Sequence, residues 1–118
     1  MGIEIFWRVF VKTKDKKKVD LILKQIRPHI ALSKIITNEV YWKDDSLYNL
    51  EFTSELFEKE NKSLILEVIR LISVISDEWD IVLPDMECED ILDFSGVSSK
   101  SFKILLISWC SFVIQEKE

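Results

Sequence analysis

The segment from Ile3 to Lys12, IEIFWRVFVK, contains the clearest strand pattern in this 118-residue chain. Its odd-numbered positions are all apolar, and its even-numbered positions alternate between charged and aromatic side chains. A period of two indicates a β-strand. Because one face is wholly apolar and the other half apolar, we expect this strand near the middle of a sheet.

A second long strand is predicted from Phe102 to Gln115, FKILLISWCSFVIQ. Beyond Lys103, its only polar interior residues are Ser108 and Ser111, so the segment is apolar on both faces. Strands that are buried on both faces show such continuous apolar runs. We therefore expect it to lie centrally, beside the first strand.

A helix is predicted soon after the first strand. Asp15 can cap its N-terminus, and Pro28 ends it by disfavouring helical geometry in Arg27. Four apolar residues fall on one stripe at helical spacing: Val19, Ile22, Leu23 and Ile26. This pattern predicts one face on the sheet and the other in solvent.

A second, more apolar helix is predicted from near Asn61 to about Asp77. Its polar stripe is narrow and consists of Ser63, Glu67, Arg70 and Asp77. A helix with so little polar surface is expected to be buried on more than one side. The following acidic segment can fold over it without an oligomer, which is the interpretation we prefer; the alternative cover is a second copy of the chain.

The remaining strands are shorter. Ile30 to Trp42 and Leu47 to Phe52 are rich in β-branched and aromatic residues, and Lys43 to Ser46 separates them. This pattern predicts a hairpin whose second arm has one solvated face. Trp79 to Leu83 alternates like a short strand, and Gly96 predicts a turn.

Together the segments predict an α+β fold with the element order β-α-β-β-α-β-β in one domain, residues 1-118. With 47% apolar residues, 31% charged residues and only two Gly and two Pro, the composition is typical of a globular chain rich in regular structure. We expect a single mixed sheet of about five strands with two helices, for which a ferredoxin-like arrangement is the nearest common pattern. The topology stays open, because that arrangement puts the last strand at an edge, whereas the two-sided apolarity of this strand favours the interior.

Charge is unevenly distributed along the chain. Residues 1–43 contain ten Lys or Arg and four Asp or Glu, residues 44–118 contain six and seventeen, and the formal net charge is −5. Because nucleic acids would meet a mostly repulsive protein, we expect no direct nucleic-acid partner. The Lys-rich segment Lys12 to Lys18 is the exception. We interpret it as a solvated turn, with a site for an anionic partner as the alternative.

The strongest asymmetry is the segment from Asp77 to Asp93, DEWDIVLPDMECEDILD, which contains eight carboxylates and no Lys or Arg. Opposite charges accelerate protein association, and an aromatic side chain among them can anchor an interface. We therefore predict that this segment docks on a basic protein surface. The predicted partner-binding residues are Glu78, Trp79, Asp80, Asp85, Glu87, Glu89, Asp90 and Asp93. The alternative is that the acids only keep the protein in solution and that Trp79 belongs to the core.

No catalytic signature occurs in the sequence. It lacks GxSxG, HExxH and dinucleotide-binding glycine patterns, and His29 is its only histidine, so we do not expect an enzyme. Cys88 and Cys110 have no CxxC spacing, and we expect neither a metal site nor a cofactor. The motif GVSSKS at 96–101 lacks the second glycine of a phosphate-binding loop.

The N-terminal apolar run is interrupted by Glu4 and Arg8, so it does not match a signal peptide. The longest apolar run, Ile104 to Ile114, is shorter than the roughly 20 residues of a membrane span. We therefore expect a cytoplasmic protein with no membrane partner.

In size, acidic character and lack of catalytic residues, the whole chain resembles bacterial immunity proteins of contact-dependent growth inhibition and other polymorphic toxin systems. The resemblance implies a cytoplasmic inhibitor that binds one cognate toxin domain with a basic surface, often a nuclease. We expect the chain itself to be a monomer or a weak homodimer. The alternative function is a small ligand-binding or regulatory domain that dimerises through its apolar second helix.

Overall fold

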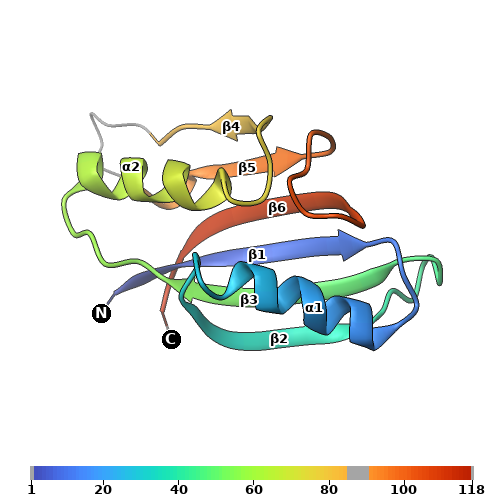
Figure 1. Ribbon diagram of the computed structural model, residues 1–118. Coiled ribbons are helices and arrows are strands. Elements are labelled where there is room, and N and C mark those ends of the chain that lie inside the picture. Colours follow the sequence, from blue (N-terminus) through green and yellow to red (C-terminus); the bar gives the residue numbers. More distant parts are fainter. Residues whose placement is uncertain (1, 85–90, 118) are drawn as a thin grey trace.

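The computed structural model describes residues 2–84 and 91–117, which form one antiparallel sheet of six strands and two α-helices (Figure 1). The strand order is β2-β3-β1-β6-β5-β4. The elements are β1 (Ile3–Val11), α1 (Lys16–Ile26), β2 (Leu32–Val40), β3 (Tyr48–Glu55), α2 (Asn61–Ile72), β4 (Asp80–Val82), the short 3-10 helix η1 (Ile91–Asp93), β5 (Ser95–Ser98) and β6 (Ile107–Glu116). The α+β class and the two helices are confirmed, whereas the mixed sheet of about five strands is corrected to six antiparallel strands.

The two strongly patterned strands form the centre of the sheet, as predicted. β1 pairs with β3 on one side and with β6 on the other, and Trp7 lies opposite Phe52 and Phe112 in the two registers. The indole ring of Trp7 stacks on Phe52, with 5.9 Å between ring centroids. Because all three side chains are buried at about zero exposure, they fix the core under the helices.

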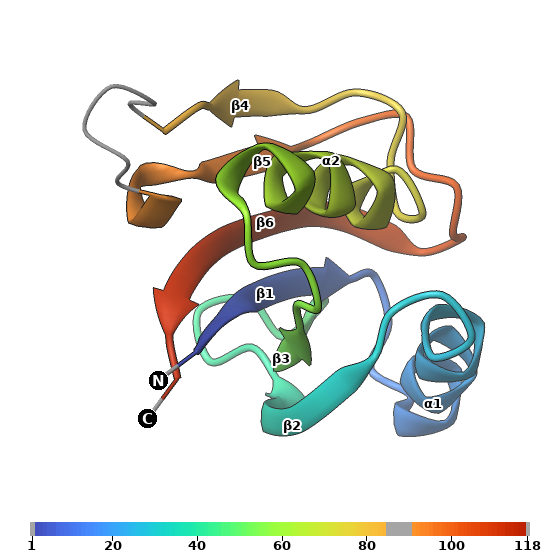
Figure 2. The ribbon, with the colours of Figure 1, turned by 90° about the vertical axis from the view of Figure 1, so that its left-hand side faces the viewer.

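The first helix also agrees with the prediction. The Asp15 carboxylate accepts a hydrogen bond of 2.9 Å from the backbone N–H of Lys17, and Arg27 ends the helix. The four residues of the apolar stripe are all buried. Both helices lie on the same side of the sheet (Figure 2), with α1 over β1, β3 and β2 and α2 toward β5 and β4.

The second helix departs from the prediction in three ways. It ends at Ile72 rather than near Asp77, and its outer surface exposes Leu66 by 69% and Ile69 by 39%. The side chain of Glu67, expected on the polar stripe, is instead buried. The expectation that α2 is buried on more than one side was therefore wrong, because its outer surface is exposed.

Gly96 lies within a strand rather than in a turn. It pairs with Ile81 of β4 and with Phe112 of β6, which makes β5 the strand that the sequence did not reveal. A Cβ atom at this position would come within 2.5 Å of Cε1 of Phe112. Glycine is thus required here because the aromatic ring lies against the backbone.

The last strand begins at Ile107, five residues later than predicted. The preceding segment is irregular: Ser101 and Leu106 have φ angles of 60° and 74°, and Phe102 forms an isolated bridge with Ser76. Positive φ in a bulky residue such as Leu106 is uncommon and interrupts a strand.

The second face of the sheet, opposite the helices, is only partly solvated. On β3, Asn49 is 8% and Thr53 is 3% exposed, so the second hairpin arm is drier than predicted. Neighbouring side chains on β1, including Phe6 and Phe10, are half-buried on the same face. Neither of the described helices is long and apolar enough to cross a membrane.

Candidate functional site

Four of the eight predicted partner-binding residues are placed by the structure. Glu78 and Trp79 precede β4, Asp80 begins β4, and Asp93 ends η1. The other four predicted residues lie outside the described ranges: Asp85, Glu87, Glu89 and Asp90.

Glu78 and Asp80 lie beside an open cleft at the edge of the sheet. The cleft has a volume of about 340 Å³, and its walls are residues 77–80 on one side and residues 97–100 on the other. β4 is the last strand in the sheet order and pairs only with β5 among the described strands. The cleft therefore lies where the chain enters β4 and leaves β5, and β4 has no second strand partner among the described residues.

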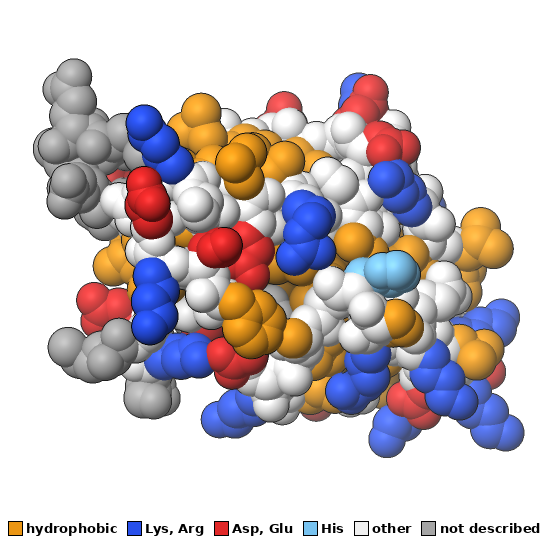
Figure 3. Space-filling model, turned by 60° about the vertical axis from the view of Figure 1, so that its left-hand side comes forward, with side chains coloured by type: hydrophobic (Ala, Val, Ile, Leu, Met, Phe, Trp, Pro, Cys, Tyr) orange, Lys and Arg blue, Asp and Glu red, His pale blue; other side chains and the backbone are white. Residues whose placement is uncertain are grey.

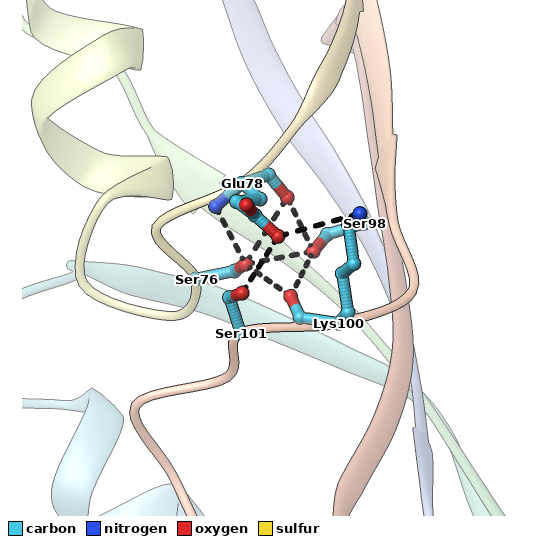
Figure 4. A network of polar contacts seen from close by, with 5 residues as sticks. All are labelled: Ser76, Glu78, Ser98, Lys100 and Ser101. Carbon is cyan, nitrogen blue, oxygen red and sulfur yellow. Dashed lines mark hydrogen bonds and ion pairs between the residues drawn. The ribbon is translucent and has the colours of Figure 1, made fainter.

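Two buried serines hold the walls of the cleft together (Figure 4). The hydroxyl oxygens of Ser76 and Ser98 are 2.7 Å apart, and these residues are 1% and 2% exposed. Ser98 donates to the Ser76 hydroxyl oxygen, and Ser76 donates to the carbonyl oxygen of Lys100 over 2.8 Å; the Ser98 hydroxyl also lies 2.7 Å from the carbonyl oxygen of Glu78. Because the two hydroxyls bond each other and the main chain of both walls, the pair acts as a structural clamp.

The carboxylates at the cleft are only loosely neutralised. Glu78 accepts a hydrogen bond of 2.7 Å from the hydroxyl of Ser101 and lies 3.7 Å from Nζ of Lys100. Asp77 lies 3.1 Å from Nζ of Lys103. Both ion pairs are largely exposed, and exposed pairs contribute little to stability. Within the described residues, Asp80 forms no ion pair, so its charge faces solvent.

The charge around this edge is mixed. Figure 3 views the helix-bearing side and shows Lys and Arg side chains interspersed with Asp and Glu. On that face the described Asp and Glu side chains do not gather into one acidic patch.

Trp79 is turned toward the protein rather than presented as a free anchor. Its indole nitrogen lies 3.0 Å from the carbonyl oxygens of both Ile72 and Ser76, and its ring packs edge-on against Phe112 with 5.5 Å between centroids. The start of the acidic segment thus contacts the C-terminal end of α2 through Trp79, but Leu66 and Ile69 on the outer surface of the helix stay exposed. The exposed apolar residues at this edge are Ile81, Val82 and Leu83, at 37%, 60% and 62%.

Asp93 is separate from the cleft. It is exposed and lies two residues before Ser95, which pairs with Val82, whereas Asp80 pairs with Val97. The strand register therefore puts Asp93 toward the opposite end of β4. The structure brings Glu78 and Asp80 together with Asp77 but leaves Asp93 apart.

Among the described residues, reactive side chains outside the cleft do not form a second cluster. Burial raises the pKa of the Cys110 thiol, which makes it a poor nucleophile. His29 is exposed beside a shallow cleft lined by Gln25, Pro28 and Lys103. No group of three or more metal-ligating side chains occurs in residues 2–84 and 91–117.

The opposite wall of the cleft was not anticipated from the sequence. Residues 97–100 belong to the motif GVSSKS, which was tested only as a phosphate-binding loop. Its Ser98 hydroxyl and Lys100 side chain instead shape and partly neutralise the cleft. The segment Ser95 to Ser98, SGVS, has no apolar alternation that would signal a strand, and Gly96 favoured a turn.

The site consequently has the chemistry of a binding surface: carboxylates that attract a cationic group, beside apolar residues on an open strand edge. Comparisons of the chain with protein-family models, with curated proteins and with solved structures found no match.

Proposed function

We propose that this protein is an inhibitor that binds one basic protein domain at its acidic edge, which we define as Asp77, Glu78 and Asp80 with the neighbouring Ile81 to Leu83. The observation that supports the proposal is the juxtaposition of a carboxylate-lined cleft with exposed apolar residues on the open strand β4. An interface of this kind combines electrostatic attraction with apolar burial.

Each part of the acidic edge has a distinct role in this proposal. The carboxylates attract the partner and select a Lys or Arg side chain, which enters the cleft and replaces Lys100 as the neighbour of Glu78. The exposed Val82 and Leu83 supply apolar contact area. The outer edge of β4 offers main-chain groups to an extended segment of the partner.

We propose that the partner is a bacterial toxin domain, in line with the resemblance to immunity proteins. A toxin that acts on nucleic acid has a basic substrate-binding surface, because it must neutralise phosphates. Carboxylates on an inhibitor can occupy or cover such a surface. In this proposal the inhibitor acts in the cytoplasm, where it protects the cell that makes it.

We also propose that the fold is a ferredoxin-like arrangement with an added edge. The order β2-β3-β1-β6, with one helix after β1 and another after β3, fits that arrangement. β5 and β4 extend the sheet beyond β6. This extension accounts for the two-sided apolarity of the last strand, and it creates the edge at which we place the partner.

The toxin partner is tested with the C-terminal domain of the protein encoded immediately upstream of this chain. We expect that domain to arrest growth when expressed alone, to co-purify with this chain, and to lose its toxicity when the two are co-expressed. If growth arrest persists on co-expression and the two proteins do not associate, the proposal is wrong.

The binding surface is tested by charge reversal. Replacing Asp77 and Asp80 by Lys should weaken the complex by at least about tenfold, because attraction becomes repulsion at the cleft. The matched control replaces Asp20 on α1 and Glu39 on β2 by Lys. Both acids are exposed and lie away from β4, and the net charge changes by the same amount as in the test variant. Equal loss in both variants would mean that only net charge matters and that the acidic edge is not the site.

The alternative function, a regulatory domain that dimerises through α2, draws support from the exposure of Leu66 and Ile69. Replacing Leu66 by Glu would then abolish a dimer while leaving the acidic edge unchanged. A protein whose association state does not respond to this change has no such interface.

A further inference from the structure

The strand β2 forms the edge of the sheet that is farthest from the acidic edge. Among the described strands it pairs only with β3, and it is first in the strand order, whereas β4 is last. Figure 1 shows no other strand or helix along its outer side. Its nine residues therefore present main-chain N–H and C=O groups with which a further strand can pair.

The side chains of β2 are poorly protected against such pairing. Ile35, Ile36 and Val40 are 37%, 48% and 41% exposed. Long edge strands that expose β-branched residues and contain no proline are the ones that recruit another strand, and proteins commonly prevent this with several charges of one sign. β2 contains only one positive and one negative residue, Lys34 and Glu39.

Lys34 and Glu39 lie on the same face of the sheet, although they are five positions apart. On a regular strand such residues would point to opposite faces, because side chains alternate. In β2 the register with β3 shifts by one residue at Ile36. Lys34 consequently pairs with Thr53 and Glu39 with Asn49, two residues of β3 on the face opposite the helices.

Both charges on β2 lack a partner in the described part of the chain. Within residues 2–84 and 91–117, neither Lys34 nor Glu39 forms an ion pair. Glu51 and Glu55, the carboxylates on the same face of the adjacent strand β3, are each in an ion pair already. The edge strand therefore offers one unpaired cation and one unpaired anion on the same face.

We propose that β2 pairs with β2 of a second copy of this chain, antiparallel and about a two-fold axis. With the axis between Ile36 and Thr37, Lys34 of each copy lies opposite Glu39 of the other, and two ion pairs form. The exposed isoleucines then lie at the centre of the interface. A strand from an unrelated protein would need this same order of charges, whereas a second copy contains it.

Three features limit the strength of this dimer. The register of β2 shifts again at Ser33, and an irregular edge forms fewer main-chain hydrogen bonds with a second strand. On the helix-bearing face, α1 contains four lysines and one aspartate, so the two copies of this helix repel each other. Each copy also has a net charge of −5. We therefore expect a dissociation constant of about 10 to 100 μM.

The inference goes beyond the proposed function, because β2 and β4 are opposite edges of the sheet. A second copy on β2 leaves the acidic edge free. For the same reason, the control in the charge-reversal test that replaces Glu39 weakens this dimer and leaves the acidic edge unchanged.

The test is sedimentation velocity on the full chain at concentrations from about 1 to 500 μM. We expect a monomer–dimer equilibrium that Lys34→Glu and Glu39→Lys each weaken by at least about fivefold, because each brings like charges together twice. Two controls should change the dissociation constant by less than about twofold: Lys62→Glu, which changes net charge as Lys34→Glu does, and Leu66→Ala on α2. A strict monomer throughout, or a dimer lost with Leu66→Ala and kept in both β2 variants, would overturn the inference.

Mixing the two charge variants tests the two-fold axis directly. In a heterodimer of Lys34→Glu with Glu39→Lys, both opposed pairs are again of opposite sign, so an equimolar mixture should associate at least about fivefold more tightly than either variant alone. The double variant with both changes should dimerise like the unchanged protein. All these residues are exposed, and urea unfolding checks that each variant is folded. A mixture that associates no better than its components would contradict the proposed pairing.

Discussion

The indole N–H of Trp7 donates a hydrogen bond of 2.8 Å to the hydroxyl of Ser54, and both residues are fully buried. The adjacent residue, Thr53, is also buried, but its hydroxyl has no hydrogen-bond partner among the described residues. These neighbouring hydroxyls on β3 therefore differ in what they contribute to stability.

We predict opposite effects from removing the two hydroxyls. Ser54→Ala should lower the free energy of unfolding by about 2 kcal/mol, because the indole N–H of Trp7 is left unpaired in the core. Thr53→Val should leave it unchanged or raise it by up to about 1 kcal/mol, since no bond is lost. Urea unfolding measures both, and a larger loss for Thr53→Val than for Ser54→Ala would contradict the assignment.

Glu67 is predicted to hold the connection between β3 and α2. Its buried carboxylate accepts hydrogen bonds from the backbone N–H groups of Phe57, at 3.1 Å, and Glu58, at 3.0 Å. Glu67→Ala should cost about 3 kcal/mol of unfolding free energy, and Glu67→Gln, which keeps one acceptor oxygen, about 1 kcal/mol. Equal and small losses for both variants in denaturant unfolding would show that the carboxylate does not brace this connection.

Gly96 should not tolerate a methyl group. In Gly96→Ala the new Cβ would overlap the Phe112 ring, so we expect a loss of about 1 to 3 kcal/mol. Phe112→Leu removes the overlapping ring atoms, so the double variant should lose less than the sum of the two single losses. Thermal unfolding of the two single variants and the double variant measures these losses. If the two single losses simply add in the double variant, the glycine is required for a reason other than the Phe112 ring.

Glu55 is predicted to make stability depend on acid pH. Hydrogen bonds from Lys117 and Ser33 lower the pKa of this carboxyl below its ordinary value of 4.5. Because the folded pKa is the lower one, the stabilisation is present above pH 4.5 and is lost as the pH falls through the folded value. Unfolding free energies of the unchanged protein and Glu55→Gln should therefore differ near neutral pH and converge in acid. A difference that does not change with pH would contradict the shift.

The sequence was most informative where apolar patterning had a single explanation. The continuous apolar run around Cys110 and the strict alternation around Trp7 placed β6 and β1 together at the centre of the sheet, because only a strand buried on both faces needs such side chains. Asp15 identified the start of α1 for an equally local reason, since its carboxylate satisfies a free N–H of the first turn.

Side chains whose partners are distant in sequence could not be placed in the same way. Glu67 has the helical spacing of a surface residue. It is buried because the segment between β3 and α2 packs against it, where the backbone N–H of Phe57 donates to its carboxylate. Trp79 lies between two acids, which fits an exposed anchor as well as a packed ring, and contact with Phe112 decides between them. Phe10 and Trp109 become neighbours only when the sheet forms, so the contact between their rings left no signal in the sequence.

The central proposal, that the acidic edge docks a basic partner, also predicts the behaviour of Lys100. This lysine lies 3.7 Å from the Glu78 carboxylate, where we place a cationic side chain of the partner. Lys100→Ala should therefore strengthen binding, because the partner no longer competes with an internal cation. The control is Lys24→Ala, which removes an exposed lysine on α1 and changes net charge equally.

The most direct measurement is the association rate constant with the domain encoded immediately upstream, followed by stopped-flow at low and high salt. We expect the rate to fall with added salt for the unchanged protein, to rise several-fold in Lys100→Ala but not in Lys24→Ala, and to lose its salt dependence when Asp77 and Asp80 are replaced by Lys. Rates that are the same for all four proteins at every salt concentration would show that the partner docks elsewhere.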